Sequence, residues 1–277
     1  MKGYVRPVGT LRAAAAVSMG LQREEHEDNF LLDGKLLMPS QARGITADIS
    51  VFELPEETYG GLFAVFDGMG GEESGEVAAY MCACEAAALR CNLRDCSPSA
   101  ERMLIRSFFD STDRKVSEKA RELEASCVGS TGVMLWVRED QVTAANLGDS
   151  RSYRLRDGEL RRLSHDHTPS QELVDAGVYT QEEMDSYPRS SAVSGFFGMA
   201  HIGRSVEPLI RSRFTGDSGD VYLLCSDGLT DMLTENRIRE IMTACDRNPE
   251  DIARALVQAA LDSGGEDNVT ALVVCMV

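Results

Sequence analysis

The stretch FAVFDGMGGEE (residues 63–73) joins an apolar, strand-like run to a carboxylate, Asp67, and then to three glycines within four residues. A turn in solvent needs one or two glycines, whereas more of them are used where the backbone must lie close to another group. The stretch therefore predicts a strand that ends at Asp67, followed by backbone in close contact with something else.

Four other segments also place a carboxylate beside a strand-like run: Glu27-Asp28 before Phe30, GDSR (148–151), SDG (226–228) and EDNVT (266–270). Any one of them alone is a common turn. If their strands share sheets, however, the carboxylates converge, and their repulsion is costly unless cations bind between them. Oxygen ligands near an exposed carbonyl suit Mg²⁺ or Mn²⁺. We therefore interpret the glycines after Asp67 as bringing the backbone close to metal.

The composition is that of a globular protein with an acidic surface. The chain has 277 residues, 43% of them hydrophobic, and a formal net charge of −17. This charge argues against nucleic acid or an anionic membrane as a partner, and no apolar run reaches the ~20 residues of a membrane span. The eight cysteines form no disulfide framework of a secreted domain. We expect reduced thiols and a cytoplasmic location.

The hydrophobic periodicity predicts many short strands and a few long helices. Strands are expected at 14–19, 30–32, 49–54, 61–66, 132–137, 142–147, 152–155, 159–163, 206–210, 221–225 and 270–276, and helices at 74–90, 100–125, 235–245 and 249–261. Pro208 limits its segment to a sheet edge, and Asp157-Gly158 is a hairpin turn. Residues 164–204 are expected to be a long loop or flap, and 37–50 a local insertion or hairpin. The order of elements indicates a mixed α+β fold with antiparallel sheets.

Taken in order, the motifs resemble a known family. They are R-x-x-x-E-D (23–28), DGMGG (67–71), GST (129–131), N-x-GDSR (146–151), SDG-x-x-D (226–231) and EDNVT (266–270). The set is similar to that of metal-dependent Ser/Thr protein phosphatases of the type 2C class, the bacterial members above all. The resemblance implies one catalytic domain over 1–277 with a variable flap at about 164–204. It implies a four-layer α+β sandwich, in which two antiparallel sheets are flanked by pairs of helices.

The resemblance also implies a site for two Mn²⁺ or Mg²⁺ ions. Asp67 would bridge both ions, the Gly68 carbonyl would bind the second, and Asp227 and Asp267 would bind the first. Asp149 would belong to a third, weaker site. A hydroxide held between two ions would then hydrolyse phosphoserine and phosphothreonine on proteins.

Other residues take supporting roles by the same resemblance. Glu27 and Asp28 would stand near the second ion, as ligands or as partners of its waters. Asp231 would hold a metal-bound water, and Arg23 would receive the phosphate through its forked guanidinium. The partners implied are phosphorylated proteins and a cognate Ser/Thr kinase, and we expect a monomer.

Two departures from the family leave the proton donor open. Met69 stands where many eukaryotic relatives have His, and Glu72 stands where bacterial relatives often have one. A metal-bound water, His26, His165 or His167 remain candidates. Two other functions also stay open at this point: a pseudophosphatase that binds phosphoproteins without turnover, and a hydrolase of small phosphate esters.

Overall fold

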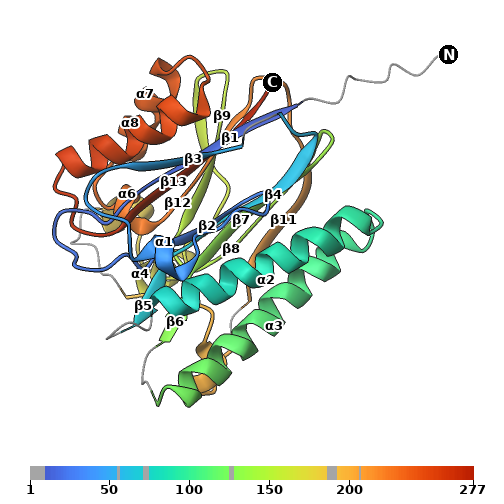
Figure 1. Ribbon diagram of the computed structural model, residues 1–277, viewed down its shortest axis with the longest axis vertical. Helices are drawn as coiled ribbons and strands as arrows, with labels where there is room; N and C mark the ends of the chain where they lie inside the picture. The colour runs from blue at the N-terminus through green and yellow to red at the C-terminus, as the bar shows by residue number, and fades with distance from the viewer. Residues whose placement is uncertain (1–9, 55–56, 71–74, 125–127, 186–191, 206) are drawn as a thin grey trace.

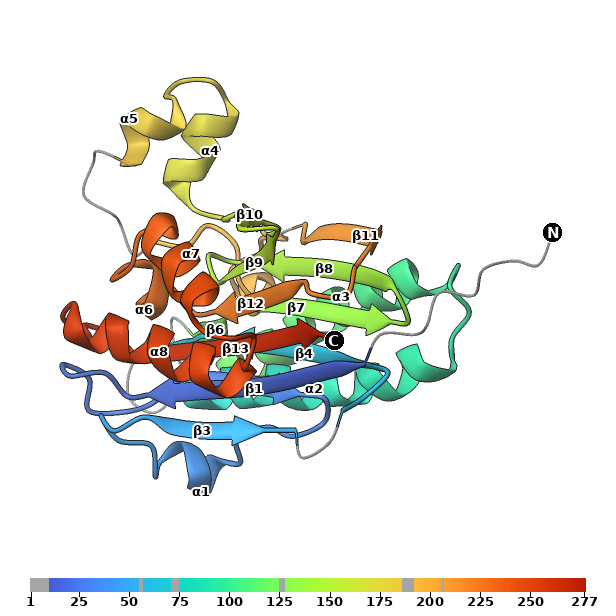
Figure 2. The ribbon, with the colours of Figure 1, turned by 90° about the horizontal axis from the view of Figure 1, so that it is seen from above.

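Two antiparallel sheets packed face to face form the centre of the molecule (Figures 1 and 2). The computed structural model describes residues 10–54, 57–70, 75–124, 128–185, 192–205 and 207–277. In spatial order, the six-stranded sheet contains β10 (Glu159–Arg162), β9 (Arg151–Arg156), β12 (Val221–Cys225), β13 (Val269–Met276), β1 (Leu11–Ser18) and β3 (Ser50–Glu53). The five-stranded sheet contains β11 (Leu209–Thr215), β8 (Gln141–Leu147), β7 (Gly132–Arg138), β4 (Gly60–Phe66) and β2 (Asn29–Leu32). A short ribbon pairs β5 (Gly68–Gly70) with β6 (Val128–Ser130).

Helices cover the outer face of each sheet. The helical segments are α1 (Pro39–Ala42), α2 (Gly75–Asp95), α3 (Glu101–Glu122), α4 (Pro169–Asp175), α5 (Gln181–Asp185), η1 (Met199–Ile202), α6 (Asp227–Thr230), α7 (Glu235–Ala244) and α8 (Pro249–Asp262). Helices α2 and α3 share a buried cluster with the five-stranded sheet, and α7 and α8 share one with the six-stranded sheet. A third cluster fills the space between the sheets. These three cores hold the strand ends, and with them the site, in fixed positions.

The alanine run of β1 explains how a helix comes close to the six-stranded sheet. Ala13 and Ala15 face the other sheet, whereas Ala16 belongs to the cluster beneath α8. Small side chains at these positions let both neighbours approach the strand closely. Asn248 caps α8 by accepting a hydrogen bond from the backbone N–H of Glu250, which fixes where that helix begins.

The predicted fold class is confirmed, and most elements lie where the periodicity placed them. Residues 221–225 form β12 as predicted, and residues 61–66 lie within β4. The strand expected at 206–210 was placed too early, because β11 spans Leu209–Thr215; it does lie at a sheet edge. Residues 74 and 125, at the expected ends of two helices, lie outside the described residues. Among the described residues, no helix combines the length and apolarity needed to cross a membrane.

Two irregular regions contain more structure than predicted. Residues 164–204, expected as a loop, include α4, α5 and η1, and Figure 2 shows α4 and α5 standing away from the sandwich. Thr168 caps α4 through its side chain, and Pro169 occupies the first turn, a combination that starts a helix even where no apolar stripe exists. Residues 37–50 contain the single-turn helix α1 in place of a hairpin.

A buried carboxylate closes the turn before β12 and gives a testable contribution to stability. Asp220 is 1% exposed and accepts hydrogen bonds from Arg156 Nε at 2.6 Å, the Tyr222 hydroxyl at 2.8 Å and the Asp217 N–H at 3.1 Å. Burial acts to raise the pKa of Asp220, but these donors outweigh it and hold the pKa below its usual value. The carboxylate therefore stabilises the folded state above the unfolded pKa of about 3.9, and this contribution is lost as the pH falls through the folded value.

We expect Asp220→Asn to lower the free energy of unfolding by about 2 kcal/mol at neutral pH, because charge-assisted hydrogen bonds are lost in a buried place. The difference from wild type should start to shrink below about pH 4 and should vanish once the pH has fallen through the lowered folded pKa of Asp220, where both chains carry a neutral group. Urea unfolding across pH measures both effects. Asp217→Asn, which removes a more exposed partner of Arg156, should cost less than about 1 kcal/mol. Equal losses for the two variants would contradict this account.

Candidate active site

Asp67 lies directly after β4 and is held by the two polar motifs that follow it in the sequence. Its carbonyl accepts a hydrogen bond from the Thr131 N–H at 2.9 Å, and its own N–H donates to Thr131 Oγ1 at 3.4 Å. The Thr131 and Ser150 hydroxyls are 2.6 Å apart, and both side chains are buried. The GST and GDSR segments therefore fix the backbone from which the Asp67 carboxylate projects.

The first glycine after Asp67 is required by neighbouring backbone. A Cβ at Gly68 would lie 2.2 Å from the Gly75 carbonyl oxygen and 2.6 Å from that of Glu27. A Cβ at Gly75 would in turn lie 2.3 Å from Glu27 Oε1. Strand β5, the start of α2 and the segment that carries Glu27 therefore lie too close together for a side chain at Gly68 or Gly75. Residues 71–74 lie outside the described residues.

Asp28 is buried beside two hydroxyls from the other sheet. Its Oδ2 accepts hydrogen bonds from Ser226 Oγ and Thr270 Oγ1, each at 2.7 Å. Asp28 is only 2% exposed. The segment before β2 is therefore joined to the ends of β12 and β13, where Asp227 and Asp267 also lie.

Asp267 and its neighbour Asn268 organise the N-terminal loop. Asp267 Oδ2 lies 2.5 Å from Arg23 Nη2, and the Arg23 side chain is 51% exposed. Asn268 accepts a hydrogen bond from the Glu27 N–H at 2.7 Å and donates to the carbonyls of Met19 and Glu25, both at 2.9 Å. One amide side chain thus holds the segment that carries both Arg23 and Glu27.

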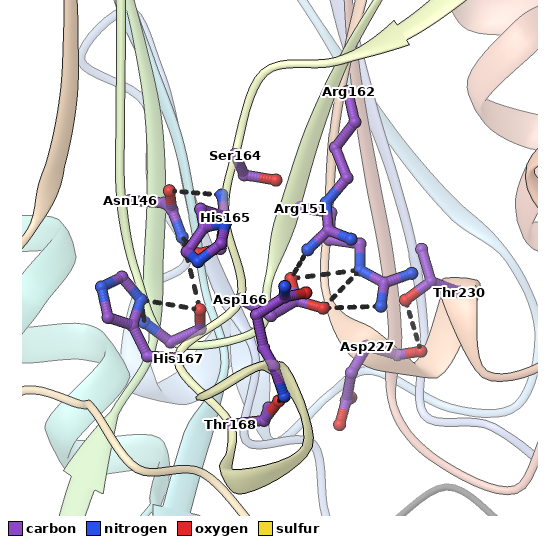
Figure 3. A network of polar contacts seen from close by, with 12 residues as sticks. Asn146, Arg151, Arg162, Ser164, His165, Asp166, His167, Thr168, Asp227 and Thr230 are labelled. Carbon is purple, nitrogen blue, oxygen red and sulfur yellow. Dashed lines mark hydrogen bonds and ion pairs between the residues drawn. The ribbon is translucent and has the colours of Figure 1, made fainter. Parts of the chain in front are cut away.

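Figure 3 shows the part of the site that faces the flap. Asp149 and Asp227 line a pocket of about 650 Å³ that also involves α4, α5, α6 and α7. Arg151 and Arg162 both point at Asp166 on its wall and form ion pairs with it, at 2.6 Å in the case of Arg151 (Figure 3). Asp149 Oδ1 is buried and has no hydrogen-bond partner among the described residues.

The carboxylates repel one another strongly in this arrangement. Burial raises the pKa of Asp67 well above its usual value, and the charges of Asp227, Asp28 and Asp149 raise it further. Burial and the charge of Asp227 raise the pKa of Asp149 to about 8. Burial and the charge of Asp231 raise the pKa of Asp227 to about 6. These shifts are those of carboxylates crowded together without enough cations.

Two more carboxylates complete the group. Burial raises the pKa of Asp28 to about 7, against the lowering effect of its two hydroxyl donors. Burial also raises the pKa of Glu27 to about 7, against the lowering effect of Arg23. The structure thus brings together the residues that the sequence singled out: Glu27, Asp28, Asp67, Gly68, Asp149, Asp227 and Asp267, with Arg23 at the rim.

This donor set fits divalent cations. It offers oxygen atoms only, it carries excess negative charge, and its Asp149 Oδ1 has no partner in the part of the chain that the structure describes. Such a set is typical of Mg²⁺ or Mn²⁺ ligation. Within the described ranges, no three His, Cys, Asp or Glu side chains stand together in a metal-ligating arrangement.

Two of the positions raised in connection with the proton donor, His26 and Met69, lie among the described residues. His26 is 3% exposed, and burial lowers its pKa to about 4, so the ring is neutral at pH 7 and carries no readily donated proton. Met69 lies in β5, paired with Gly129 of β6, and has no proton to give. Glu72 lies outside the described residues.

The other two histidines considered as proton donors, His165 and His167, lie at the base of the flap. His165 Nε2 lies 2.7 Å from Asp175 Oδ2 on α4. His167 Nδ1 lies 3.1 Å from the Gly148 N–H, and its Nε2 lies 3.1 Å from the Glu207 carbonyl. His165 is thus held within the flap, whereas His167 joins the flap to Gly148, directly after β8, and to Glu207.

The sequence reasoning quoted the motifs of Thr131, Ser150 and Asn268 but gave these residues no task. For Ser150 and Asn268, the signal was a small polar side chain directly after a predicted carboxylate at a strand end, whereas Thr131 has no such neighbour. A buried hydroxyl or amide next to a carboxylate needs a partner, and that requirement would have assigned them to its support.

We expect Asn268→Ala to lower the free energy of unfolding by about 2–3 kcal/mol, because a buried N–H and two carbonyls lose their partner. Turnover should fall as well, since the loop carrying Arg23 and Glu27 is released. Thermal or urea unfolding gives the first quantity. Asn92→Ala, at an exposed position on α2, should stay within about 0.5 kcal/mol of wild type. A neutral Asn268→Ala would contradict the anchoring role.

Comparison with known proteins places this geometry in a family. The family model for protein phosphatase 2C matches residues 50–269. Serine/threonine protein phosphatase PstP of Mycobacterium tuberculosis is 34% identical over 267 residues, which is 95% of this chain but 44% of that relative. This chain therefore spans less than half the length of that relative. Serine/threonine phosphatase stp of Listeria monocytogenes is 32% identical over 222 residues, covering 76% of this chain and 82% of the relative.

Solved structures agree with the sequence relatives. The structure of the M. tuberculosis phosphatase PstP/Ppp superposes with a TM-score of 0.77 at 29% identity, covering 96% of this chain and 99% of that one. The catalytic domain of PstP in complex with two manganese ions gives a TM-score of 0.75 at 28% identity, covering 97% and 99% of the two chains. On the family match, the two relatives and the shared fold, the chain belongs to the protein phosphatase 2C family.

Proposed function

We propose that this chain hydrolyses phosphoserine and phosphothreonine on proteins in a reaction that depends on two Mn²⁺ or Mg²⁺ ions. The observation that carries the proposal is the convergence of buried, mutually repelling carboxylates from both sheets at one end of the sandwich. Relatives named Ser/Thr phosphatases, and a neighbour solved with two manganese ions, support the assignment.

The ion-holding residues in this proposal are Asp67, the Gly68 carbonyl, Asp227 and Asp267, with Asp149 serving a third, weaker site. Ions bound there acidify water and offset the charge of a phosphoryl group. The crowding described above supports this assignment, because cations would relieve the repulsion that raises the carboxylate pKa values.

The other residues of the proposed site would bind phosphate or orient water. Arg23, half-exposed at the rim, would bind two phosphate oxygens through its guanidinium. Asp28 and Glu27 would orient water or complete the ligand set, and Asp28 is held for this by Ser226 and Thr270. Asp231, near Asp227 and Asp149, would hold a further water.

We further propose that residues 1–277 act as a single catalytic domain whose flap spans about 164–204. In this proposal the enzyme works in the cytoplasm as a monomer and opposes a Ser/Thr kinase. The shared cores of both sheets and the match over nearly the whole chain support the single domain.

The experiment compares turnover of a phosphothreonine peptide with that of p-nitrophenyl phosphate, each with added Mn²⁺. We expect both to be hydrolysed, the activity to vanish in EDTA, and Asp227→Asn to be inactive. A strong preference for the small ester over every phosphopeptide would assign a small-ester hydrolase. A folded wild type that binds phosphopeptide without turnover would assign a pseudophosphatase. Either result would overturn the proposal.

A further inference from the structure

Three arginines lie together near β10 and β11, which are edge strands of the two large sheets. They are Arg154 on β9, Arg161 on β10 and Arg211 on β11, and we call them the arginine surface. Arg161 stands directly opposite Arg154 in the strand register. Arg211 Nε donates to the Leu163 carbonyl at 2.6 Å, just beyond the end of β10. Figure 2 shows β10 and β11 on the same side of the molecule. The three guanidinium groups therefore share one region although they come from different sheets.

This grouping is electrostatically unfavourable in the isolated chain. Like charges directly opposite one another on neighbouring strands repel. Within the described residues none of the three arginines forms an ion pair, and the Nε of Arg154 is buried without a hydrogen-bond acceptor. A buried guanidinium donor without an acceptor costs free energy. An external anion would offset the positive charge of this pair from the side of the exposed Arg161.

Neighbouring arginines show that partners are available nearby. Arg151 and Arg162 pair with Asp166, and Arg156 pairs with Asp217 and Asp220. The whole chain has 45 acidic residues against 28 lysines and arginines. A shortage of carboxylates therefore does not explain why the three arginines lack an ion pair among the described residues.

The surface is accessible and extends along β11. Arg161 and Arg211 are exposed. Arg213, also exposed, follows in the bulge of the same strand with a φ of 52°. A bulge at a sheet edge redirects side chains and disrupts regular pairing. The positive region is therefore elongated and follows the two strand edges.

The surface lies beside the proposed active site and is distinct from it. Arg154 is three residues along β9 from Arg151, or about 10 Å at the rise of a strand, and Arg151 lines the pocket that contains Asp149 and Asp227. Side chains alternate along β10, so Arg162 faces that pocket and Arg161 faces away from it. A peptide bound at the site would reach the arginine surface by crossing the edge strand β10.

We propose that the arginine surface docks an acidic, carboxylate-rich segment of the phosphoprotein substrate, and this inference rests on the proposed function. Guanidinium groups bind carboxylates through two parallel hydrogen bonds, and the surface offers them in a row. The net charge of −17 repels a long polyanion such as nucleic acid. A short acidic segment, in contrast, would lie close to the three arginines alone, so their local positive charge would attract it.

The test uses two phosphothreonine peptides with the same phosphosite, one carrying a run of glutamates about six residues away and the other carrying glutamines there. A second pair places the run on the other side of the phosphosite. The variant is Arg161→Ala/Arg211→Ala. Its matched control is Arg121→Ala/Arg239→Ala, which removes the same charge from exposed positions on α3 and α7. p-Nitrophenyl phosphate, which is too small to reach the surface, reports the chemistry alone.

For wild type and the control variant, we expect the glutamate peptide of one pair to have a kcat/KM about tenfold above its glutamine partner at low salt, as a few exposed ion pairs would give. The ratio should fall to near one in Arg161→Ala/Arg211→Ala, with unchanged p-nitrophenyl phosphate turnover. A tenfold ratio that persists in this variant, or a ratio near one in wild type for both pairs, would overturn the docking role.

A failure of the proposed function would be visible separately, as wild type that does not turn over p-nitrophenyl phosphate. In that case fluorescence anisotropy of an unphosphorylated glutamate peptide still tests the surface. Binding that Arg161→Ala/Arg211→Ala weakens supports it, and equal binding overturns it. Tighter binding of a single-stranded oligonucleotide at the same arginines would overturn the assignment to a protein segment.

Discussion

Asp67→Asn is expected to abolish phosphatase activity while making the metal-free protein more stable. The substitution keeps the shape of the side chain and removes one charge from a group in which burial, Asp227, Asp28 and Asp149 all disfavour ionisation. Relief of that repulsion should raise the metal-free free energy of unfolding by about 1 kcal/mol or more. Turnover should fall at least about 1000-fold, because the loss of a residue that would hold the proposed ions would raise the barrier by several kcal/mol.

Opposite signs of the two effects distinguish a metal centre from a structural carboxylate. Adding Mn²⁺ should stabilise wild type by mass action and should stabilise Asp67→Asn much less. Glu118→Gln removes the same charge from an exposed position on α3 and should change neither quantity. An Asp67→Asn protein that is less stable than wild type without metal, yet still active, would contradict the account.

Gly68→Ala is expected to destabilise the protein by about 3 kcal/mol and to remove most of its activity. The added Cβ would lie 2.2 Å from the Gly75 carbonyl oxygen and 2.6 Å from that of Glu27. Both are backbone atoms, so β5, the start of α2 or the Glu27 segment must shift, and overpacking of this kind costs about 1–3 kcal/mol or more. Urea unfolding and p-nitrophenyl phosphate turnover measure the two losses.

Gly158→Ala provides the matched control for this prediction. Gly158 lies in the β9–β10 hairpin with a φ of 80°, and a Cβ there would meet nothing within 4 Å. Its cost should be the backbone strain alone, about 1 kcal/mol, with normal turnover. If Gly68→Ala resembled Gly158→Ala in both measurements, the tight contact around Gly68 would not be what holds the site.

The long elements of the fold could be predicted because their burial is periodic. Residues 221–225 are buried throughout and form β12 as predicted. Strand β11 was misplaced because Arg211, Ser212 and Arg213 lie at an exposed edge with a bulge and give no apolar pattern. The short ribbon of β5 and β6 and the helices α1 and α6 were missed because three or four residues are too few to show a period.

The sequence singled out the carboxylates that the fold brings together, but it did not identify the residues that support them. A carboxylate at a strand end is visible in the sequence, and the family resemblance linked five such segments. The contacts that hold these carboxylates in place are made by residues far apart in the sequence. The interpretation of the glycines needs to be extended, because Gly68 is required by the backbone of Gly75 and Glu27. Long-range contacts of this kind, like that between Asn268 and Glu27, leave no local pattern.

The most direct test of the central claim is the release of phosphate from a phosphothreonine peptide as Mn²⁺ is removed with EDTA and then restored. The account predicts steady turnover with Mn²⁺, none in EDTA, and full recovery when Mn²⁺ is added back in excess. Turnover that continues unchanged in EDTA would contradict a metal-dependent site built from Asp67, Asp227 and Asp267.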